Sequence, residues 1–260
     1  MTASAVIADP AAPTFDGPAR PSLARLTGAE LRKMVDTRAG FWLQVTVLGL
    51  TLAFAIIQAV VGQAADHTLH DILVSAVLPV QVLLPVVGIL LVSSEWSQRT
   101  TLVTFTLVPQ RPRILVAKLA AGILLAVAAF LISLGLAVLI TAIAAPATHG
   151  TWSLSGVVPA QILLLVVVSM VMGLGFGAML LSSAPAIVLY FGLPLAWTAL
   201  ASIPALRGPA RWLDAGRSFD PMTSHVMSAA EWAHVGTTLA AWMLLPVLIG
   251  IWRIARNEVS

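Results

Sequence analysis

Six long apolar runs divide the chain, and most of its polar residues gather between them. Each run is close to the roughly 20 residues that a helix needs to cross a hydrocarbon core of about 30 Å. We place the runs near 41–61, 72–92, 115–144, 157–181, 186–206 and 233–252. Because lipid offers no partners for backbone N–H and C=O groups, such runs cross as helices. The pattern predicts an all-α integral membrane protein with six transmembrane helices.

Composition supports this class. The 260 residues are 59% hydrophobic and 10% charged, with a mean hydropathy of +0.97. Soluble domains carry about 25% charged residues. The chain has no Cys, which excludes disulfides and Cys-ligated metals. The net charge is only +3, and the basic residues lie beside apolar runs, so nucleic acid is not an expected partner.

The positions of the basic residues predict the orientation. Of the 14 Lys and Arg, all but Arg207, Arg211 and Arg217 lie before the first run, between the second and third runs, at the start of the third run (Lys118), or after the sixth. Segments rich in Lys and Arg remain in the cytoplasm. Both termini are therefore expected in the cytoplasm, and the segment 207–232 outside. Its charges and large apolar residues predict short helices at the outer surface.

The chain divides into an N-terminal tail and one membrane domain. Residues 1–22 are rich in Ala and Pro, lack the order of a signal peptide, and are expected to form a disordered cytoplasmic tail. Residues 23–260 then form one six-helix transmembrane domain.

An amphipathic helix is expected just before the first run. Thr27 and Glu30 have the spacing of a capping box, which predicts a helix that starts at Thr27. Leu31, Met34 and Val35 then share one side. We expect this helix to lie at the interface, with its apolar face in lipid and its bases toward anionic headgroups. A plain juxtamembrane linker is the alternative.

No ionisable residue lies well inside a run, which argues against coupling to a proton gradient. Lys118 is close to one end of the third run and is expected to snorkel. Spans without charge favour an apolar or amphipathic cargo.

The sequence offers one candidate metal motif and no catalytic motif. His67 and His70, flanked by Asp66 and Asp71, have the groups for a zinc site, but a hydrated turn is the better interpretation, so no metal is predicted. No catalytic constellation occurs, and the chain has no G-x-x-x-x-G-K-[ST] phosphate loop, so we do not expect an enzyme.

Small and aromatic residues predict packing between helices. Gly173 and Gly177 form a GxxxG pattern, whose small residues let two helices approach closely. Trp197 and Trp242 do not fall at the ends of the runs, where Trp usually lies, and are expected to pack between helices.

The segment 93–118 is the most informative part of the chain. It holds Glu95 and four basic residues between two spans. Ser94 is expected to cap a short helix that opens with Glu95. In 100–107 the β-branched residues let strand compete with helix. Pro109 and Pro112 then break the segment, and the third span is expected to start after Pro112. The alternative is a solvated loop that only sets topology.

The pattern in this segment resembles the first cytoplasmic loop of ABC-2-type permeases, the membrane subunits of ATP-binding-cassette exporters. The residues that carry the resemblance are Glu95, Arg99, Thr100, Leu107, Pro109, Arg111, Arg113 and Lys118. Leu31-Arg-Lys33 is similar to the amphipathic entry helix of that family. One position differs, because Arg99 stands where the family commonly has Gly.

The resemblance implies a function. In these permeases the loop carries a coupling helix that sits in a cleft of a separate ATPase subunit, and two permease chains, identical or not, join two ATPases. ATP and Mg²⁺ then belong to the partner, and this chain carries no cofactor. The expected location is a bacterial-type cytoplasmic membrane. The residues expected at the ATPase contact are Glu95, Trp96, Arg99, Thr100 and Thr101, with Pro109, Arg111 and Arg113 shaping the turn. The alternatives are a non-transporting scaffold subunit and a membrane-embedded enzyme.

Overall fold

The computed structural model describes residues 22–61, 68–97, 111–144, 152, 154–206, 208 and 211–256, and within these every regular element is a helix. In chain order the elements are α1 (Leu23–Asp36), α2 (Arg38–Val61), α3 (Leu69–Ser97), α5 (Arg111–Ala144), α6 (Val157–Leu180), α7 (Ser183–Ala201), η2 (Arg211–Leu213), α9 (Ala215–Phe219), α10 (Pro221–Ser224), α11 (Ala229–Leu239), η3 (Ala240–Leu244) and α12 (Leu245–Arg256).

The six predicted spans are confirmed. Within the described residues, six helical stretches are long and apolar enough to cross a membrane: α2, α3, α5, α6, α7 and the continuous stretch Ala229–Arg253, which joins α11, η3 and α12. They contain between 19 and 32 residues, enough to cross a core of about 30 Å at a rise of about 1.5 Å per residue. The short helices η2, α9 and α10 confirm that the segment 207–232 contains short helices.

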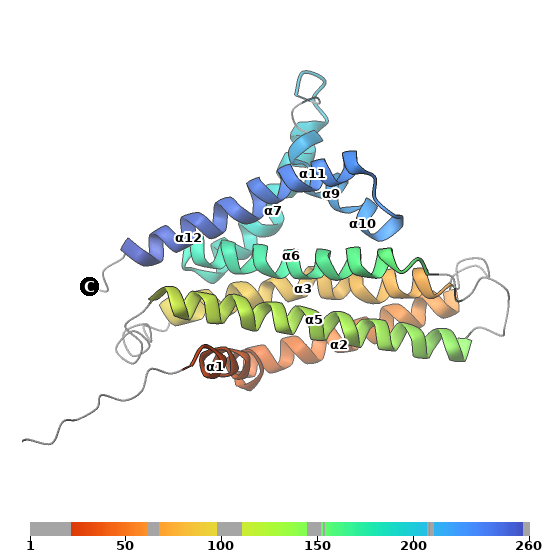
Figure 1. Ribbon diagram of the computed structural model, residues 1–260, viewed down its shortest axis with the longest axis horizontal. Helices are drawn as coiled ribbons and strands as arrows, with labels where there is room; N and C mark the ends of the chain where they lie inside the picture. Colours follow the sequence, from red (N-terminus) through yellow and green to blue (C-terminus); the bar gives the residue numbers. More distant parts are fainter. Residues whose placement is uncertain are drawn as a thin grey trace, which may run out of the picture.

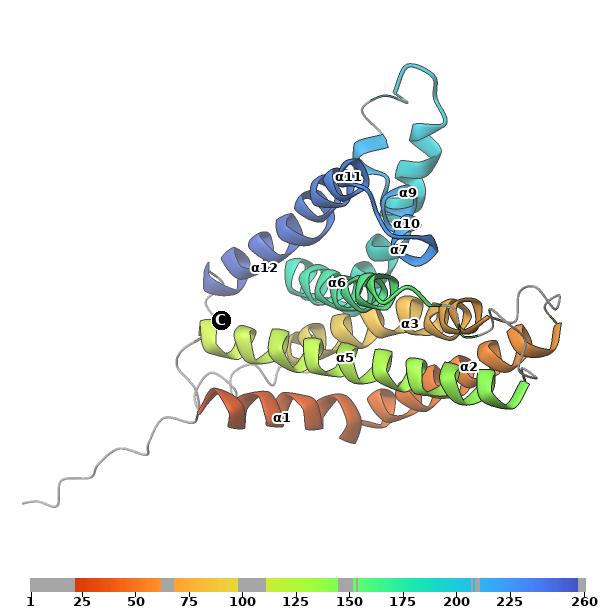
Figure 2. The same cartoon turned by 45° about the vertical axis from the view of Figure 1, so that its right-hand side comes forward.

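The spans form two groups, and α6 is the member of the first group that faces the second. Helices α2, α3, α5 and α6 run side by side, whereas α7 and α11–α12 lean away on the far side of α6 (Figures 1 and 2). Helix α1 is seen end-on in Figure 1, so it runs across the direction of the spans.

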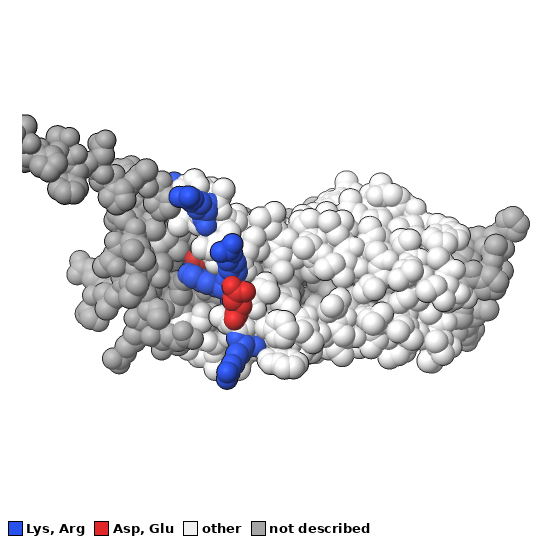
Figure 3. All heavy atoms as spheres, turned by 90° about the horizontal axis from the view of Figure 1, so that it is seen from below, with Lys and Arg blue, Asp and Glu red and all other residues white. Residues whose placement is uncertain are grey.

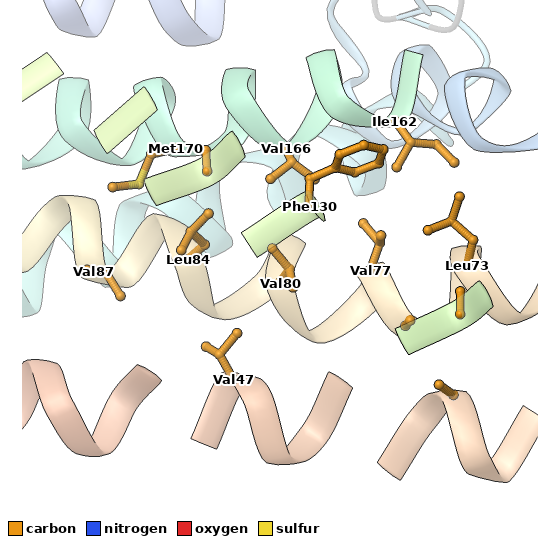
Figure 4. Close-up of a cluster of buried hydrophobic side chains, with 14 of the residues drawn as sticks. Val47, Leu73, Val77, Val80, Leu84, Val87, Phe130, Ile162, Val166 and Met170 are labelled. Atoms are coloured by element: carbon orange, nitrogen blue, oxygen red, sulfur yellow. The ribbon is translucent and has the colours of Figure 1, made fainter. Parts of the chain in front are cut away.

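Helix α3 lies in the middle of the first group. Figure 4 shows its side chains between α6 on one side and α2 on the other, with Val80 and Leu84 among those buried. About 61% of the α3 span and 72% of the α6 span are buried, against 17% of α2. All three are strongly apolar, so hydropathy alone does not say which of them faces lipid.

Glycines on α6 determine how closely its neighbours approach. A Cβ atom added to Gly173 would lie 2.4 Å from the Pro85 carbonyl oxygen of α3, and one on Gly177 would lie 2.9 Å from the Ile89 oxygen. Gly175, on the opposite side of α6, would clash at 2.8 Å with Val247 of α12. Since lipid tails are as apolar as Leu, close packing of small residues holds membrane helices together. The GxxxG pattern thus forms a contact between two helices of the same chain, α6 and α3.

The predicted start of the N-terminal helix is wrong. Helix α1 begins at Leu23, where the Ser22 hydroxyl caps it by accepting from the Arg25 N–H at 3.3 Å. Thr27 and Glu30 lie inside the helix and are buried, so they form no capping box. The local pattern was overridden because the Glu30 carboxylate is used in tertiary contacts, described below.

The predicted helix start at Ser94 is also wrong. Helix α3 continues without a break from the span to Ser97, so Ser94 lies in its last turns and does not cap a new helix. Helix α5 begins at Arg111, one residue before Pro112, whose missing N–H costs no hydrogen bond in a first turn. Residues 98–110, including the 100–107 stretch, lie outside the described residues.

Candidate functional site

The described ends of the segment 93–118 belong to two long helices. Glu95 and Trp96 lie in the last turn of α3, and Arg111 and Arg113 in the first turn of α5. The remaining predicted contact residues lie outside the described residues: Arg99, Thr100, Thr101 and Pro109. The described ends of the segment therefore belong to the last turns of α3 and the first turns of α5.

Lys118 joins three elements at the end of the bundle where α1 lies. Its Nζ donates to Glu30 Oε2 of α1 at 2.7 Å and to the Leu91 carbonyl of α3 at 3.1 Å. The side chains of Lys118 and Glu30 are only 5% and 6% exposed. Glu30 Oε1 also accepts from Lys33, which is 43% exposed. A single ammonium thus connects α1 to the helices before and after the candidate coupling segment.

This contact corrects two predictions. Lys118 does not snorkel to water, because α1 covers it and supplies the carboxylate. The apolar side of α1 does not face lipid as a whole either: Met34 is 3% exposed and Leu31 packs against the core, whereas Val35 points outward. An ion pair removes the need for the ammonium to reach solvent.

The outer side of α1 is basic. Arg25, Arg32 and Lys33 of α1 are exposed there together with Asp36, and Arg38, the first residue of α2, is exposed beside them. Figure 3 shows Lys and Arg side chains gathered in a band across one end of the molecule. A basic band beside apolar spans agrees with a cytoplasmic position for this end.

Two further contacts tie helices together at the same end. The Ser93 hydroxyl of α3 donates to the Ile89 carbonyl at 2.7 Å and lies 3.1 Å from the Ser183 hydroxyl of α7. Arg253 of α12 donates to the Met179 carbonyl of α6 at 2.6 Å. With Lys118, these contacts connect α1, α3, α5 and α7, and separately α6 with α12.

At the opposite end of the bundle, one glutamine holds the segment 211–232 on α6. We call 211–232 the outer segment, because it is expected outside the cell. Buried Gln161 donates from Nε2 to the carbonyls of Met222 and His225 at 3.3 and 2.8 Å, and its Oε1 accepts from Met227 N at 3.2 Å. Each atom of the amide that can form a hydrogen bond is thus used, which makes the outer segment a folded part of the bundle.

The two tryptophans that lie away from the ends of the spans pack between helices, as predicted. Trp197 of α7 and Trp242 of η3 contact edge to face, with ring centroids 6.2 Å apart. Trp242 Nε1 also donates to the Leu213 carbonyl at 2.7 Å, which fixes η2 against the sixth span.

The candidate metal motif is only partly within the described residues. Asp66 and His67 fall outside the described residues, while the Asp71 carboxylate accepts from the Thr68 hydroxyl at the start of α3. Among the described residues no three His, Cys, Asp or Glu side chains form a group that could hold a metal.

Gln81 and Gln161 were not predicted, because they are polar but carry no ionisable group. A lone amide within an apolar run was the signal for both. The Glu30–Lys118 pair had no local signal, since 88 residues separate its members.

Comparison with protein-family models and with curated proteins finds no match to this chain. What the chain itself establishes is a multi-pass helical membrane protein.

Proposed function

We propose that this chain is the membrane-spanning permease subunit of an ATP-driven exporter of the ABC-2 type. A separate ATP-binding-cassette subunit would bind ATP and Mg²⁺ and dock on the segment 93–118. Two permease chains and two ATPase subunits would form the complete exporter. The expected cargo is apolar or amphipathic, because the spans offer little charge to a polar one.

The observation that carries the proposal is the position of the motif. The segment that resembles a coupling loop leaves α3 at Ser97 and enters α5 at Arg111, on the side where exposed bases gather. A force applied to this segment would act directly on both helices.

The contacts of Lys118 supply a route for such a force. Lys118 of α5 bonds to α3 through Leu91 and to α1 through Glu30. Helix α1 leads into α2 within two residues, because α1 ends at Asp36 and α2 begins at Arg38. A displacement of α5 would therefore move the first span as well as the second, which is what alternating access requires.

The ATPase contact is tested by reversing charges in the segment. Glu95→Lys and Arg99→Glu are each expected to reduce the ATPase subunit that co-purifies with the tagged chain by about tenfold or more, since reversing an interface charge creates repulsion. Arg256→Glu is the matched control, because Arg256 is an exposed base at the end of α12, outside the segment.

The control variant should retain the subunit, and all variants should elute as folded protein. If both segment variants retained full association, 93–118 would be only a topology-setting loop, and a scaffold function would become the better interpretation.

A further inference from the structure

A second feature lies at the opposite end of the spans. A cavity of about 500 Å³ opens between α3, α6, α7 and the outer helices α9 and α10. Its walls are mainly apolar and aromatic, and among them Phe191 comes from α7 and Phe219 from α9. The cavity extends from the outer segment down to Gln81, near the middle of the α3 span.

Gln81 is the unusual residue of this lining. Its side-chain amide has no hydrogen-bond partner among the described residues, although it lies within a span. The amide of Gln161, by contrast, makes three hydrogen bonds, and that of Gln58 bonds to Ser75. An amide at this depth is costly without a partner, so its exposure to the cavity makes it available to a polar group of an occupant.

The outer end of the cavity is acidic. Asp220 is exposed, and within the described part of the chain its carboxylate makes no ion pair or hydrogen bond. Its backbone carbonyl accepts from the hydroxyls of Thr223 and Ser224, and its backbone N–H donates to the Gly216 carbonyl. Asp220 is also the one charged residue among the described side chains of the lining. The neighbouring Arg217 is instead directed to Asp214, 3.4 Å away.

The other polar groups of the lining are occupied. The Ser169 hydroxyl donates to the Leu165 carbonyl at 2.8 Å and is hydrogen-bonded to Tyr190. Thr223 donates to the Asp220 carbonyl at 3.0 Å. The amide of Gln81 and the carboxylate of Asp220 are therefore the two groups of the described lining that remain for a ligand.

Aromatic rings complete the walls. Tyr190 contacts Phe176 and Phe191 edge to face, at 5.8 and 4.9 Å between centroids, so these rings are held in fixed positions. Aromatic faces attract organic cations as well as apolar groups.

We propose that this cavity binds an amphipathic organic cation. The cationic group pairs with Asp220 at the outer mouth, a hydrogen-bonding group meets Gln81, and the apolar body lies against Phe191, Phe219 and the α3 side chains. As a cargo site, the assignment rests on the proposed export function and defines its substrate class; as a binding site, it does not need the ATPase.

The test uses the purified full chain in lipid nanodiscs with rhodamine 6G, a fluorescent aromatic cation, measured by polarisation against empty discs. Saturable binding is expected. Asp220→Asn should weaken it by about fivefold, the upper range for a solvent-accessible charge pair. Gln81→Leu should weaken it by a similar factor of about five, from the lost hydrogen bond.

Three controls define the outcome. Asp36→Asn removes an exposed acid at the other end of the spans and should leave the affinity unchanged. The uncharged probe N-phenyl-1-naphthylamine should bind Asp220→Asn as well as it binds the unaltered chain. Melting temperatures of all variants establish that each is folded.

Equal rhodamine affinities for the unaltered chain, Asp220→Asn and Gln81→Leu would overturn the site, as would binding no greater than that of empty discs. Because the assay contains no ATPase, such a failure removes the cargo site without touching the coupling proposal. Intact rhodamine binding without ATPase association would support the cargo site and contradict the coupling proposal.

Discussion

The buried pair of Glu30 and Lys118 gives the sharpest stability prediction. At 2.7 Å the two charges attract by about 6 kcal/mol at an effective dielectric constant of about 20, but this is offset by the several kcal/mol that each loses on leaving water. The net value of the pair is therefore small. Removing one member costs more, because the other charge stays buried.

We expect Glu30→Met to destabilise the chain by about 3 kcal/mol, the lower end for a broken buried pair, because Lys118 keeps the Leu91 carbonyl. Lys118→Met should cost about 2 kcal/mol, since Glu30 keeps its contact with Lys33. The double variant should cost no more than about 2 kcal/mol, which implies a coupling energy of about 3 kcal/mol.

The assay is equilibrium unfolding in lipid bicelles by sodium dodecyl sulfate, followed through the fluorescence of the 8 Trp residues. Lys33→Met is the matched control, because it removes a half-exposed partner of the same carboxylate and should cost under about 1 kcal/mol. Additive effects, with a coupling energy below about 0.5 kcal/mol, would refute the claim that the two charges are held together away from water.

Three further predictions concern packing and topology. Gly177→Leu should destabilise the chain by about 2–3 kcal/mol in the same assay, because its side chain would enter the α3 backbone; an unchanged stability would contradict the helix contact. Trp242→Phe should lose about 1 kcal/mol, since the hydrogen bond from the indole to the Leu213 carbonyl is removed, and should speed amide hydrogen exchange across the short helices that this bond anchors; unchanged exchange would show that this bond does not fix the outer segment. In this naturally Cys-free chain, a membrane-impermeant maleimide should label Ser155→Cys in intact cells and Asp36→Cys only after permeabilisation, and the opposite result would invert the topology.

Hydropathy predicted the spans because crossing lipid imposes a length and an apolar composition on each segment separately. The glycine pair on α6 and the inner position of Trp242 were predictable for a similar reason, since each is a local departure from the usual pattern of a span. None of these inferences required knowledge of which helices are neighbours.

The errors arose where tertiary contacts overrode a local pattern. Thr27 and Glu30 have the spacing of a helix cap, yet Glu30 is used 88 residues away, by Lys118. Lys118 lies at the depth from which lysines usually snorkel, yet α1 covers it. The outer cavity was not predictable either, because Gln81 and Asp220 are far apart in the chain and only the tertiary fold brings them into the lining of one cavity.

We propose that a separate ATPase drives this chain. The most direct test of this proposal is to purify the tagged chain in mild detergent from the cells in which it occurs, identify the proteins that accompany it by mass spectrometry, and assay ATP hydrolysis. We predict an ATP-binding-cassette subunit at about one per chain, with Mg²⁺-dependent ATPase activity. A clean preparation without a nucleotide-binding partner and without activity would contradict the account.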